Sequence, residues 1–188
     1  MNLPNRLTLL RICLVPVCVF FLLVPLPHNY LWALLVFLAA SLTDLFDGKI
    51  ARERQLVTNF GKLLDPLADK VLVTSVLFCF IELGLTGSLV VIIIVAREFL
   101  VTSLRLVAVE GGRVIASSMW GKVKTVTQIV AIIAVLLLQE LVTLFPAVAP
   151  AIPVAAVGEC LLWVAAIITL ISGVKYIWDN RDCIGRDW

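Results

Sequence analysis

The chain has 188 residues, of which 62% are apolar and only 15% are charged, and its mean hydropathy is +1.09. So few polar residues cannot cover a protein of this size in water, which excludes an ordinary soluble domain. A net charge of +2 gives no overall field for nucleic acid, and the five cysteines show no CxxC spacing. We therefore expect an all-α integral membrane protein without a nucleic-acid partner.

Six apolar stretches are each close to the roughly 20 residues that a helix needs to cross a bilayer. In chain order, the predicted helices are Leu10–Pro27, Leu31–Ile50, Leu64–Leu83, Leu89–Val109, Lys122–Glu140 and Ile152–Tyr176. The connections are short and rich in Pro or Gly, so none has room for a second domain. We expect residues 1–188 to form a single membrane domain with six transmembrane helices.

Basic residues are distributed unevenly along these helices. Every Lys and Arg except Arg97 lies at one set of helix ends, and none lies in the opposite loops. The positive-inside rule then places these ends and both termini in the cytoplasm. The outer loops contain His28, expected as a solvated turn residue, and Glu82, Glu140 and Glu159, also expected to be solvated.

Four aspartates stand near the cytoplasmic ends of the second and third predicted helices. They share two helical stripes with small residues: Asp44, Asp47, Gly48 and Ala51 on one helix, and Gly61, Asp65 and Asp69 on the other. Several ionised carboxylates beside hydrocarbon need a compensating positive charge. A divalent metal would supply this charge, and an all-oxygen ligand set favours Mg²⁺ or Mn²⁺ over zinc.

The pattern Asp44-x2-Asp47-Gly48-x2-Ala51-Arg52-x8-Gly61-x3-Asp65-x3-Asp69 resembles the complete signature of the class I CDP-alcohol phosphotransferases. The resemblance implies that family's fold of six transmembrane helices, a homodimer, and an active site at the cytoplasmic face of a bacterial plasma membrane. There, a CDP-linked lipid would meet an alcohol. It also implies two Mg²⁺ or Mn²⁺ ions, held over the pyrophosphate by Asp44, Asp47, Asp65 and Asp69.

The same resemblance implies roles for the individual residues of the signature. Asp69 matches the proposed general base that takes the proton of the acceptor's hydroxyl. Arg52 would stabilise a phosphate or orient a carboxylate, and the small residues would let the cytidine end lie against the backbone. The CDP-lipid would thus be bound by Asp47, Gly48, Ala51, Arg52 and Gly61.

A second group of cations at the same membrane face bears on the identity of the alcohol. Its members are Arg97, Arg105, Arg113, Lys122 and Lys124. Inositol or serine would need few of them, whereas a phosphorylated alcohol needs a fixed anion site. Three further segments are similar to bacterial family members that use sn-glycerol 3-phosphate: Leu3-Pro4-Asn5-x2-Thr8-x2-Arg11, Arg97-Glu98-Phe99-x5-Arg105 and Gly121-Lys122-x-Lys124-Thr125-x2-Gln128.

This second resemblance implies transfer of the phosphatidyl group from CDP-diacylglycerol to sn-glycerol 3-phosphate, which gives phosphatidylglycerophosphate and CMP. Arg105 and Lys122 match the residues that bind the acceptor phosphate. The residues that would close the site from the first helix are Asn5, Thr8 and Arg11. Four of these cations have an alternative role as anchors to lipid headgroups: Arg105, Arg113, Lys122 and Lys124.

Arg97 lies too deep in its predicted helix to reach the membrane surface. We expect it to face the cavity or to form an internal ion pair, and we expect the adjacent Glu98 to point elsewhere. Two kinds of alternative function stay open. One is the same chemistry with inositol 3-phosphate, serine or phosphatidylglycerol as acceptor. The other is a divalent-cation carrier, although the carboxylates cluster at one face and the two halves of the chain show no repeat of the motif.

Overall fold

The chain is helical wherever regular structure is described. A computed structural model describes residues 3–54, 59–110, 119–146 and 153–181, and side chains over 8–43, 70–108, 119–146 and 153–181. The helices are α1 (Leu3–Leu23), α2 (Asn29–Arg54), α3 (Asn59–Glu82), α4 (Ser88–Glu110), α5 (Met119–Leu144) and α6 (Val154–Asp179). The prediction of an all-α chain with six helices is therefore confirmed, and the differences lie in the helix ends.

The first helix ends earlier than predicted, at Leu23 instead of Pro27. Pro25 and Pro27 cannot donate backbone hydrogen bonds, so they form a turn with His28, whose φ is +58°. Helix α3 is terminated by Gly84, which follows its last turn and has φ +69°. The amides of Gly84 and Leu85 donate to the carbonyls of Ile81 and Phe80 at 3.0 and 2.8 Å. This is the Schellman arrangement that satisfies the last carbonyls of a helix.

Helices α2 and α3 extend further into the polar segment between them than predicted. Helix α2 runs to Arg54 and helix α3 begins at Asn59, whereas the apolar stretches alone ended at Ile50 and began at Leu64. Hydropathy detects only the apolar part of a helix, so it misses helical backbone that continues into polar residues. Each of the four aspartates lies on helical backbone.

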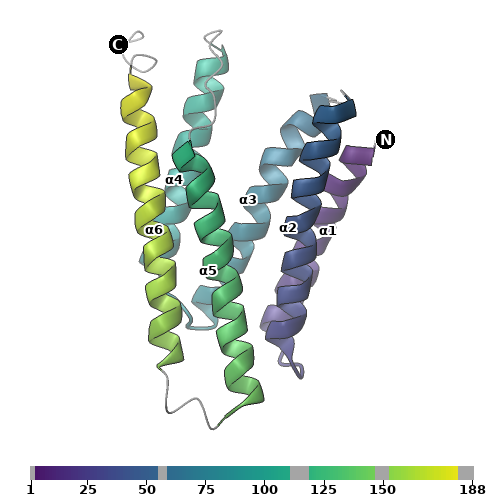
Figure 1. Cartoon of the computed structure of the whole chain (residues 1–188), viewed down its shortest axis with the longest axis vertical. Helices are drawn as coiled ribbons and strands as arrows, with labels where there is room; N and C mark the ends of the chain where they lie inside the picture. The colour runs from purple at the N-terminus through teal and green to yellow at the C-terminus, as the bar shows by residue number, and fades with distance from the viewer. Residues whose placement is uncertain (1–2, 55–58, 111–118, 147–152, 182–188) are drawn as a thin grey trace.

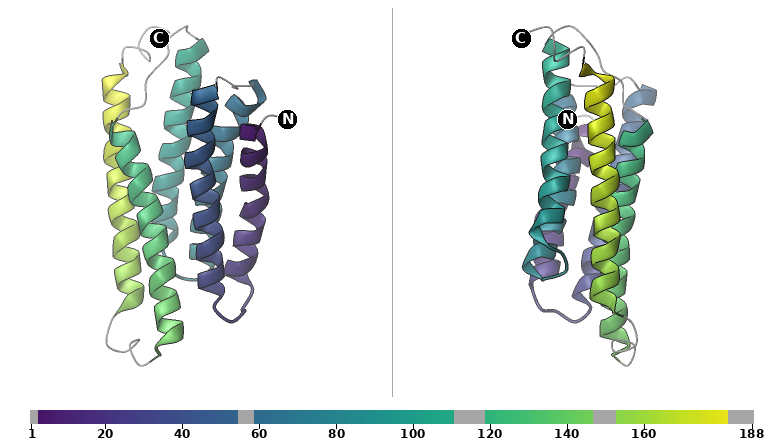
Figure 2. Two further views of the ribbon diagram at one scale, coloured as in Figure 1. Left: turned by 45° about the vertical axis from the view of Figure 1, so that its right-hand side comes forward. Right: turned by 90° about the vertical axis from the view of Figure 1, so that its left-hand side faces the viewer.

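The helices run alternately up and down an elongated bundle (Figure 1). Helix α1 packs against α2 and α3, while α6 packs against α4 and α5, and contacts of α2 with α5 and of α3 with α4 join the two groups. Figure 2 shows the same pairs from two further sides. The start of α1, the end of α2, the start of α3 and the end of α6 lie at one end of the bundle, here called the signature end.

The outside of the bundle carries large apolar side chains, and its interior holds an apolar core together with a few buried polar residues. Phe99, Ile92 and Val126 are about 60% exposed or more, whereas Arg97 and Thr169 are buried. Among the described residues, α5 and α6 are long and apolar enough to cross a membrane. These features indicate association with a membrane.

At the opposite end of the bundle, one carboxylate joins the α1–α2 turn to α5. Glu140 is 4% exposed, and its Oε1 lies 2.5 Å from Nδ1 of His28 while its Oε2 accepts from the Leu31 amide at 3.1 Å. The prediction that Glu140 is solvated is therefore wrong, because its partners lie more than a hundred residues away in the sequence. Glu82, Glu159 and His28 are exposed, as predicted.

We expect Glu140→Leu to lower the free energy of unfolding by about 1–3 kcal/mol, because it leaves the Leu31 amide and the His28 ring without their acceptor. Thermal unfolding in detergent measures this loss. Glu159→Leu, which changes an exposed glutamate on α6, is the matched control and should leave the unfolding midpoint unchanged. Equal midpoints for the two variants would contradict the stabilising role of Glu140.

Candidate functional site

The aspartate signature lies on two consecutive helices that contact each other. Asp44 and Asp47 are in the C-terminal half of α2, and Asp65 and Asp69 are in the N-terminal half of α3. Both segments lie at the signature end of the bundle (Figure 1). The side chains predicted to hold the metals and the CDP-lipid lie outside the described ones, and they are Asp44, Asp47, Gly48, Ala51, Arg52, Gly61, Asp65 and Asp69. Their convergence stays a prediction.

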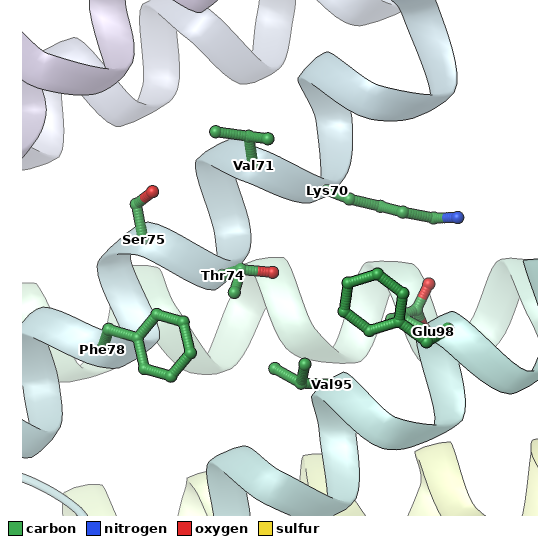
Figure 3. Close-up of a pocket in the computed structure, with 8 residues that line it drawn as sticks. Lys70, Val71, Thr74, Ser75, Phe78, Val95 and Glu98 are labelled. Atoms are coloured by element: carbon green, nitrogen blue, oxygen red, sulfur yellow. The ribbon is translucent and has the colours of Figure 1, made fainter. Parts of the chain in front are cut away.

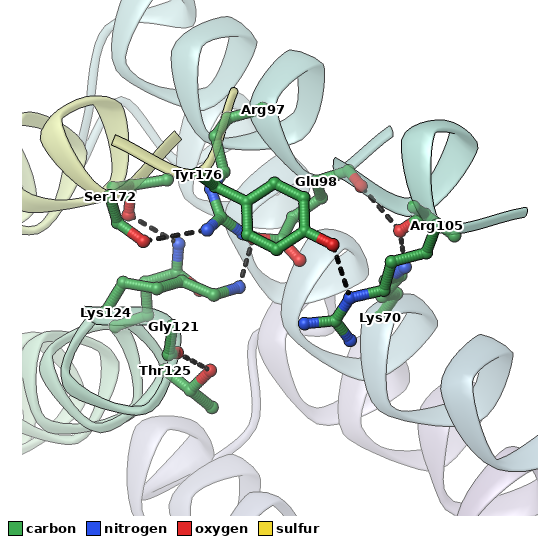
Figure 4. Close-up of polar contacts among 12 residues, drawn as sticks. Lys70, Arg97, Glu98, Arg105, Gly121, Lys124, Thr125, Ser172 and Tyr176 are labelled. Carbon is green, nitrogen blue, oxygen red and sulfur yellow. Dashed lines mark hydrogen bonds and ion pairs between the residues drawn. The ribbon is translucent and has the colours of Figure 1, made fainter. Parts of the chain in front are cut away.

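Two of the predicted acceptor-site cations belong to a buried ion cluster, which consists of Arg97, Glu98, Lys124 and Ser172. Arg97 donates from Nη1 to Glu98 Oε1 at 3.2 Å and from Nη2 to Ser172 Oγ at 2.8 Å. Lys124 on α5 donates from Nζ to the same Glu98 Oε1 (Figure 4). Two cations thus share one carboxylate oxygen, and all three charged side chains have low exposure.

The described contacts of the Arg97 guanidinium lie within the protein. This guanidinium forms the internal ion pair, and the partner is Glu98. The prediction that Glu98 points elsewhere is wrong, because its side chain is long enough to turn back toward the guanidinium of the preceding residue. Whether Arg97 and Lys124 also attract a substrate phosphate stays a prediction.

Arg105 has a different environment from Arg97. It is exposed, its Nε donates to the hydroxyl of Tyr176 at 3.2 Å, and its Cζ lies 5.5 Å from the centre of that ring. Lys122 is exposed on α5, one residue after Gly121, whereas the side chain of Arg113 lies outside the described residues. Arg105 is thus an exposed cation that is oriented by an uncharged partner.

The predicted contribution of the first helix is described only in part. Thr8 and Arg11 are both completely buried in α1, where the helix packs against α2 and α3. The side chain of Asn5 lies outside the described ones. A wholly buried arginine near the start of a helix is too far from water to act as a headgroup anchor. Its role in closing the site stays a prediction.

Sequence reasoning missed a set of residues on the last helix. Thr169, Ser172, Gly173 and Tyr176 are buried and stand at i, i+3, i+4 and i+7, and we call them the α6 polar stripe. The stripe receives side chains from two other helices: Gln128 donates to Thr169 at 2.9 Å, and Ser172 and Tyr176 accept from the two arginines of α4. The signal was available, because polar residues at helical spacing in an apolar helix mark its inward face.

Gly173 gives Arg97 the room it needs. A Cβ on Gly173 would lie 2.7 Å from Arg97 Cγ, closer than real contacts allow. We expect Gly173→Ala to push the guanidinium away from Ser172 and to lower the free energy of unfolding by about 1–3 kcal/mol. Gly158→Ala on the same helix is the matched control, since its Cβ would meet Val135 at an ordinary 3.5 Å. Unfolding curves of both variants test this expectation, and equal stability would refute it.

Helices α3 and α4 are joined at the signature end by a polar chain. Lys70, the residue after Asp69, donates from Nζ to Thr102 Oγ1, and Thr102 donates to the Glu98 carbonyl at 2.7 Å. A cavity of about 240 Å³ lies beside these contacts, with Lys70 and Glu98 at one end and Phe78 toward the other (Figure 3). The residue after the signature is thereby connected to α4, the helix that carries Arg97 and Arg105.

The sequence is similar to those of known proteins. A family model described as CDP-alcohol phosphatidyltransferase matches residues 1–172. The chain is 41% identical to a CDP-diacylglycerol–glycerol-3-phosphate 3-phosphatidyltransferase of Bacillus subtilis, over 97% of both chains, and 38% identical to the protein of the same name from Rickettsia bellii, over 93% of both. It is also 39% identical to a probable phosphatidylglycerophosphate synthase of Mycobacterium tuberculosis, over 94% of this chain and 80% of that protein.

Proposed function

The chain belongs to the CDP-alcohol phosphatidyltransferase family, and we propose that it transfers the phosphatidyl group of CDP-diacylglycerol to sn-glycerol 3-phosphate. The products are phosphatidylglycerophosphate and CMP. The observation that carries this proposal is the similarity, over nearly the full length of both chains, to relatives named for this reaction. The geometry adds an oriented cation, Arg105, at the end of the bundle where the signature lies.

In the proposed reaction, the carboxylate of Asp69 takes the proton of one of the two free hydroxyls of glycerol 3-phosphate. The hydroxyl oxygen attacks the phosphorus that carries the diacylglycerol. The bond from that phosphorus to the oxygen bridging it to CMP then breaks, and CMP leaves with the bonding electrons. Asp69 lies in the N-terminal half of α3, beside the polar chain formed by Lys70, Thr102 and Glu98.

We propose that Asp44, Asp47, Asp65 and Asp69 hold two divalent ions, Mg²⁺ or Mn²⁺. The donor set fits such ions because it offers only carboxylate oxygens, and these lie on two helices that contact each other at one end of the bundle. When bound, the ions supply charge neutralisation for the pyrophosphate. The CDP part of the lipid would lie against the backbone at Gly48, Ala51 and Gly61, with Asp47 and Arg52 beside it.

The acceptor carries a phosphate dianion, and the cations of α4 and α5 are suited to bind it. Arg105 presents a planar guanidinium whose paired N–H donors match two phosphate oxygens. Lys122 is exposed on α5. Arg113 would join them, and Asn5, Thr8 and Arg11 would close the site from α1.

The proposed setting is a bacterial plasma membrane, crossed six times, with both termini and the site facing the cytoplasm. The up-and-down order of the helices supports this arrangement, as does the position of the start of α1 and the end of α6 at one end. The bias of Lys and Arg toward the same helix ends sets the orientation. We also propose that the protein acts as a homodimer, as the family resemblance implies.

The reaction is tested by measuring CMP release from CDP-diacylglycerol by the detergent-purified protein with Mg²⁺. Parallel reactions contain sn-glycerol 3-phosphate, inositol, inositol 3-phosphate, serine or phosphatidylglycerol, and one contains no acceptor. We expect release only with glycerol 3-phosphate. Release with another alcohol would keep the aspartate chemistry and overturn the acceptor, whereas no release with any acceptor would favour a cation carrier.

A further inference from the structure

We infer that Tyr176 is a positioning residue for the acceptor: it holds the guanidinium of Arg105 so that the two Nη atoms face the phosphate of glycerol 3-phosphate. This inference rests on the function proposed above. It assigns a role to α6, the helix to which no predicted site residue belongs. Tyr176 itself would not touch the substrate, and it would act through Arg105.

The contact between the two side chains is made in two ways. The Tyr176 hydroxyl accepts a hydrogen bond from Arg105 Nε at 3.2 Å, and the guanidinium carbon lies 5.5 Å from the centre of the ring. Tyr176 is only 2% exposed, so packing between α4 and α6 fixes its ring. Arg105 is exposed, and Figure 4 shows the end of its guanidinium pointing away from the Tyr176 hydroxyl.

The two arginines of α4 are held by different atoms. Arg97 uses both Nη atoms on partners within the protein, Glu98 and Ser172. Arg105 is held through Nε, and among the described residues its Nη atoms have no hydrogen-bond partner. A guanidinium held in this way keeps the pair of donors that binds two oxygens of one phosphate. The geometry therefore indicates a structural role for Arg97 and a ligand-binding role for Arg105.

The uncharged nature of Tyr176 matters for this role. A carboxylate would also orient Arg105, as Glu98 orients Arg97, but it would cancel most of the attraction for a phosphate dianion. A phenol hydroxyl fixes the guanidinium and leaves its charge intact. An arginine side chain also loses rotamer entropy when it is fixed, and a side chain that is already oriented loses less of this entropy on binding.

The test is the kinetic effect of Tyr176→Phe, which removes the hydroxyl and keeps the ring. We expect the KM for glycerol 3-phosphate to rise roughly 3- to 10-fold, as for loss of one hydrogen bond of ordinary net strength, with kcat and the KM for CDP-diacylglycerol unchanged. The chain's other tyrosine, Tyr30 in the first turn of α2, provides the matched control. Tyr30→Phe should leave all three constants unchanged.

A double-mutant cycle shows whether Tyr176 acts through Arg105. Arg105→Lys keeps the charge but lacks Nε, so adding Tyr176→Phe to it should raise the KM for glycerol 3-phosphate by less than twofold further. An undiminished effect in that background would overturn the inference. So would a fall in kcat or a weaker affinity for CDP-diacylglycerol in Tyr176→Phe alone, since these indicate a merely structural role.

Failure of this inference can be told apart from failure of the proposed function. If Arg105→Ala raises the KM for glycerol 3-phosphate and Tyr176→Phe does not, only the role of Tyr176 is overturned. If neither variant changes that KM while the wild-type protein uses glycerol 3-phosphate, the reaction stands and the phosphate is bound elsewhere. If the wild-type protein does not use glycerol 3-phosphate, both are overturned. Arg181→Ala is the control for loss of an arginine that stacks on a ring, because Arg181 lies 5.1 Å from the Trp178 ring.

Discussion

Asp69→Asn is expected to lower kcat by about 10²- to 10⁴-fold while most of the affinity for metal and CDP-diacylglycerol is kept. The amide has the shape of the carboxylate and still offers one oxygen ligand, but it cannot take the proton of the acceptor's hydroxyl. Asp47→Ala removes a ligand outright, so we expect it to lose both binding and turnover. CMP release and binding of CDP-diacylglycerol are measured on each variant.

The exposed Asp179 at the end of α6 offers a matched control for the change from aspartate to asparagine. Asp179→Asn should behave as the wild-type protein in both measurements. Activity of Asp69→Asn close to that of the wild type would remove Asp69 as the base. Loss of CDP-diacylglycerol binding in that variant would instead indicate that Asp69 acts chiefly as a metal ligand.

The largest effect on stability is expected for Glu98→Leu, which should lower the free energy of unfolding by about 3–5 kcal/mol. Arg97 and Lys124 are both buried, and they donate to the same oxygen of this carboxylate. Without Glu98, Arg97 and Lys124 would both lose the carboxylate that they share at low exposure. The shift of the thermal unfolding midpoint in detergent measures this loss.

A second substitution separates this charge effect from a loss of packing. Adding Lys124→Leu to Glu98→Leu removes one of the two cations that donate to Glu98, so the double variant should be more stable than Glu98→Leu alone. Glu82→Leu changes an exposed glutamate at the end of α3 and is the control. If the double variant is less stable than the single one, repulsion between the cations is not the cause.

The helices could be predicted from the sequence because each contains an apolar stretch of nearly the length of a membrane span. Their ends could not, since helical backbone continues into polar residues that hydropathy does not mark. Helix α2 runs on to Arg54 for this reason, and α1 stops before Pro25 because proline chemistry overrides an apolar run. The number of crossings and their orientation stay predictions.

The helices that carry the candidate site residues could be predicted where these residues are close in sequence. Fixed spacing placed the four aspartates on two neighbouring helices, and the structure confirms the helical backbone at all four. Contacts between distant residues could not be predicted, because they depend on rotamers and on helix packing. Glu98 turning back to Arg97, Glu140 reaching His28, and Tyr176 meeting Arg105 are of this kind.

The order of the helices along the chain determines when the site can be completed during synthesis. The signature is finished as soon as α3 has been made, and Arg105 follows on α4, but its partner Tyr176 lies near the end of the last helix. If Tyr176 orients Arg105 as inferred, a nascent chain that has completed only five helices holds every signature aspartate but an Arg105 that is not yet oriented. Efficient use of the acceptor would then begin only after α6 has packed against α4.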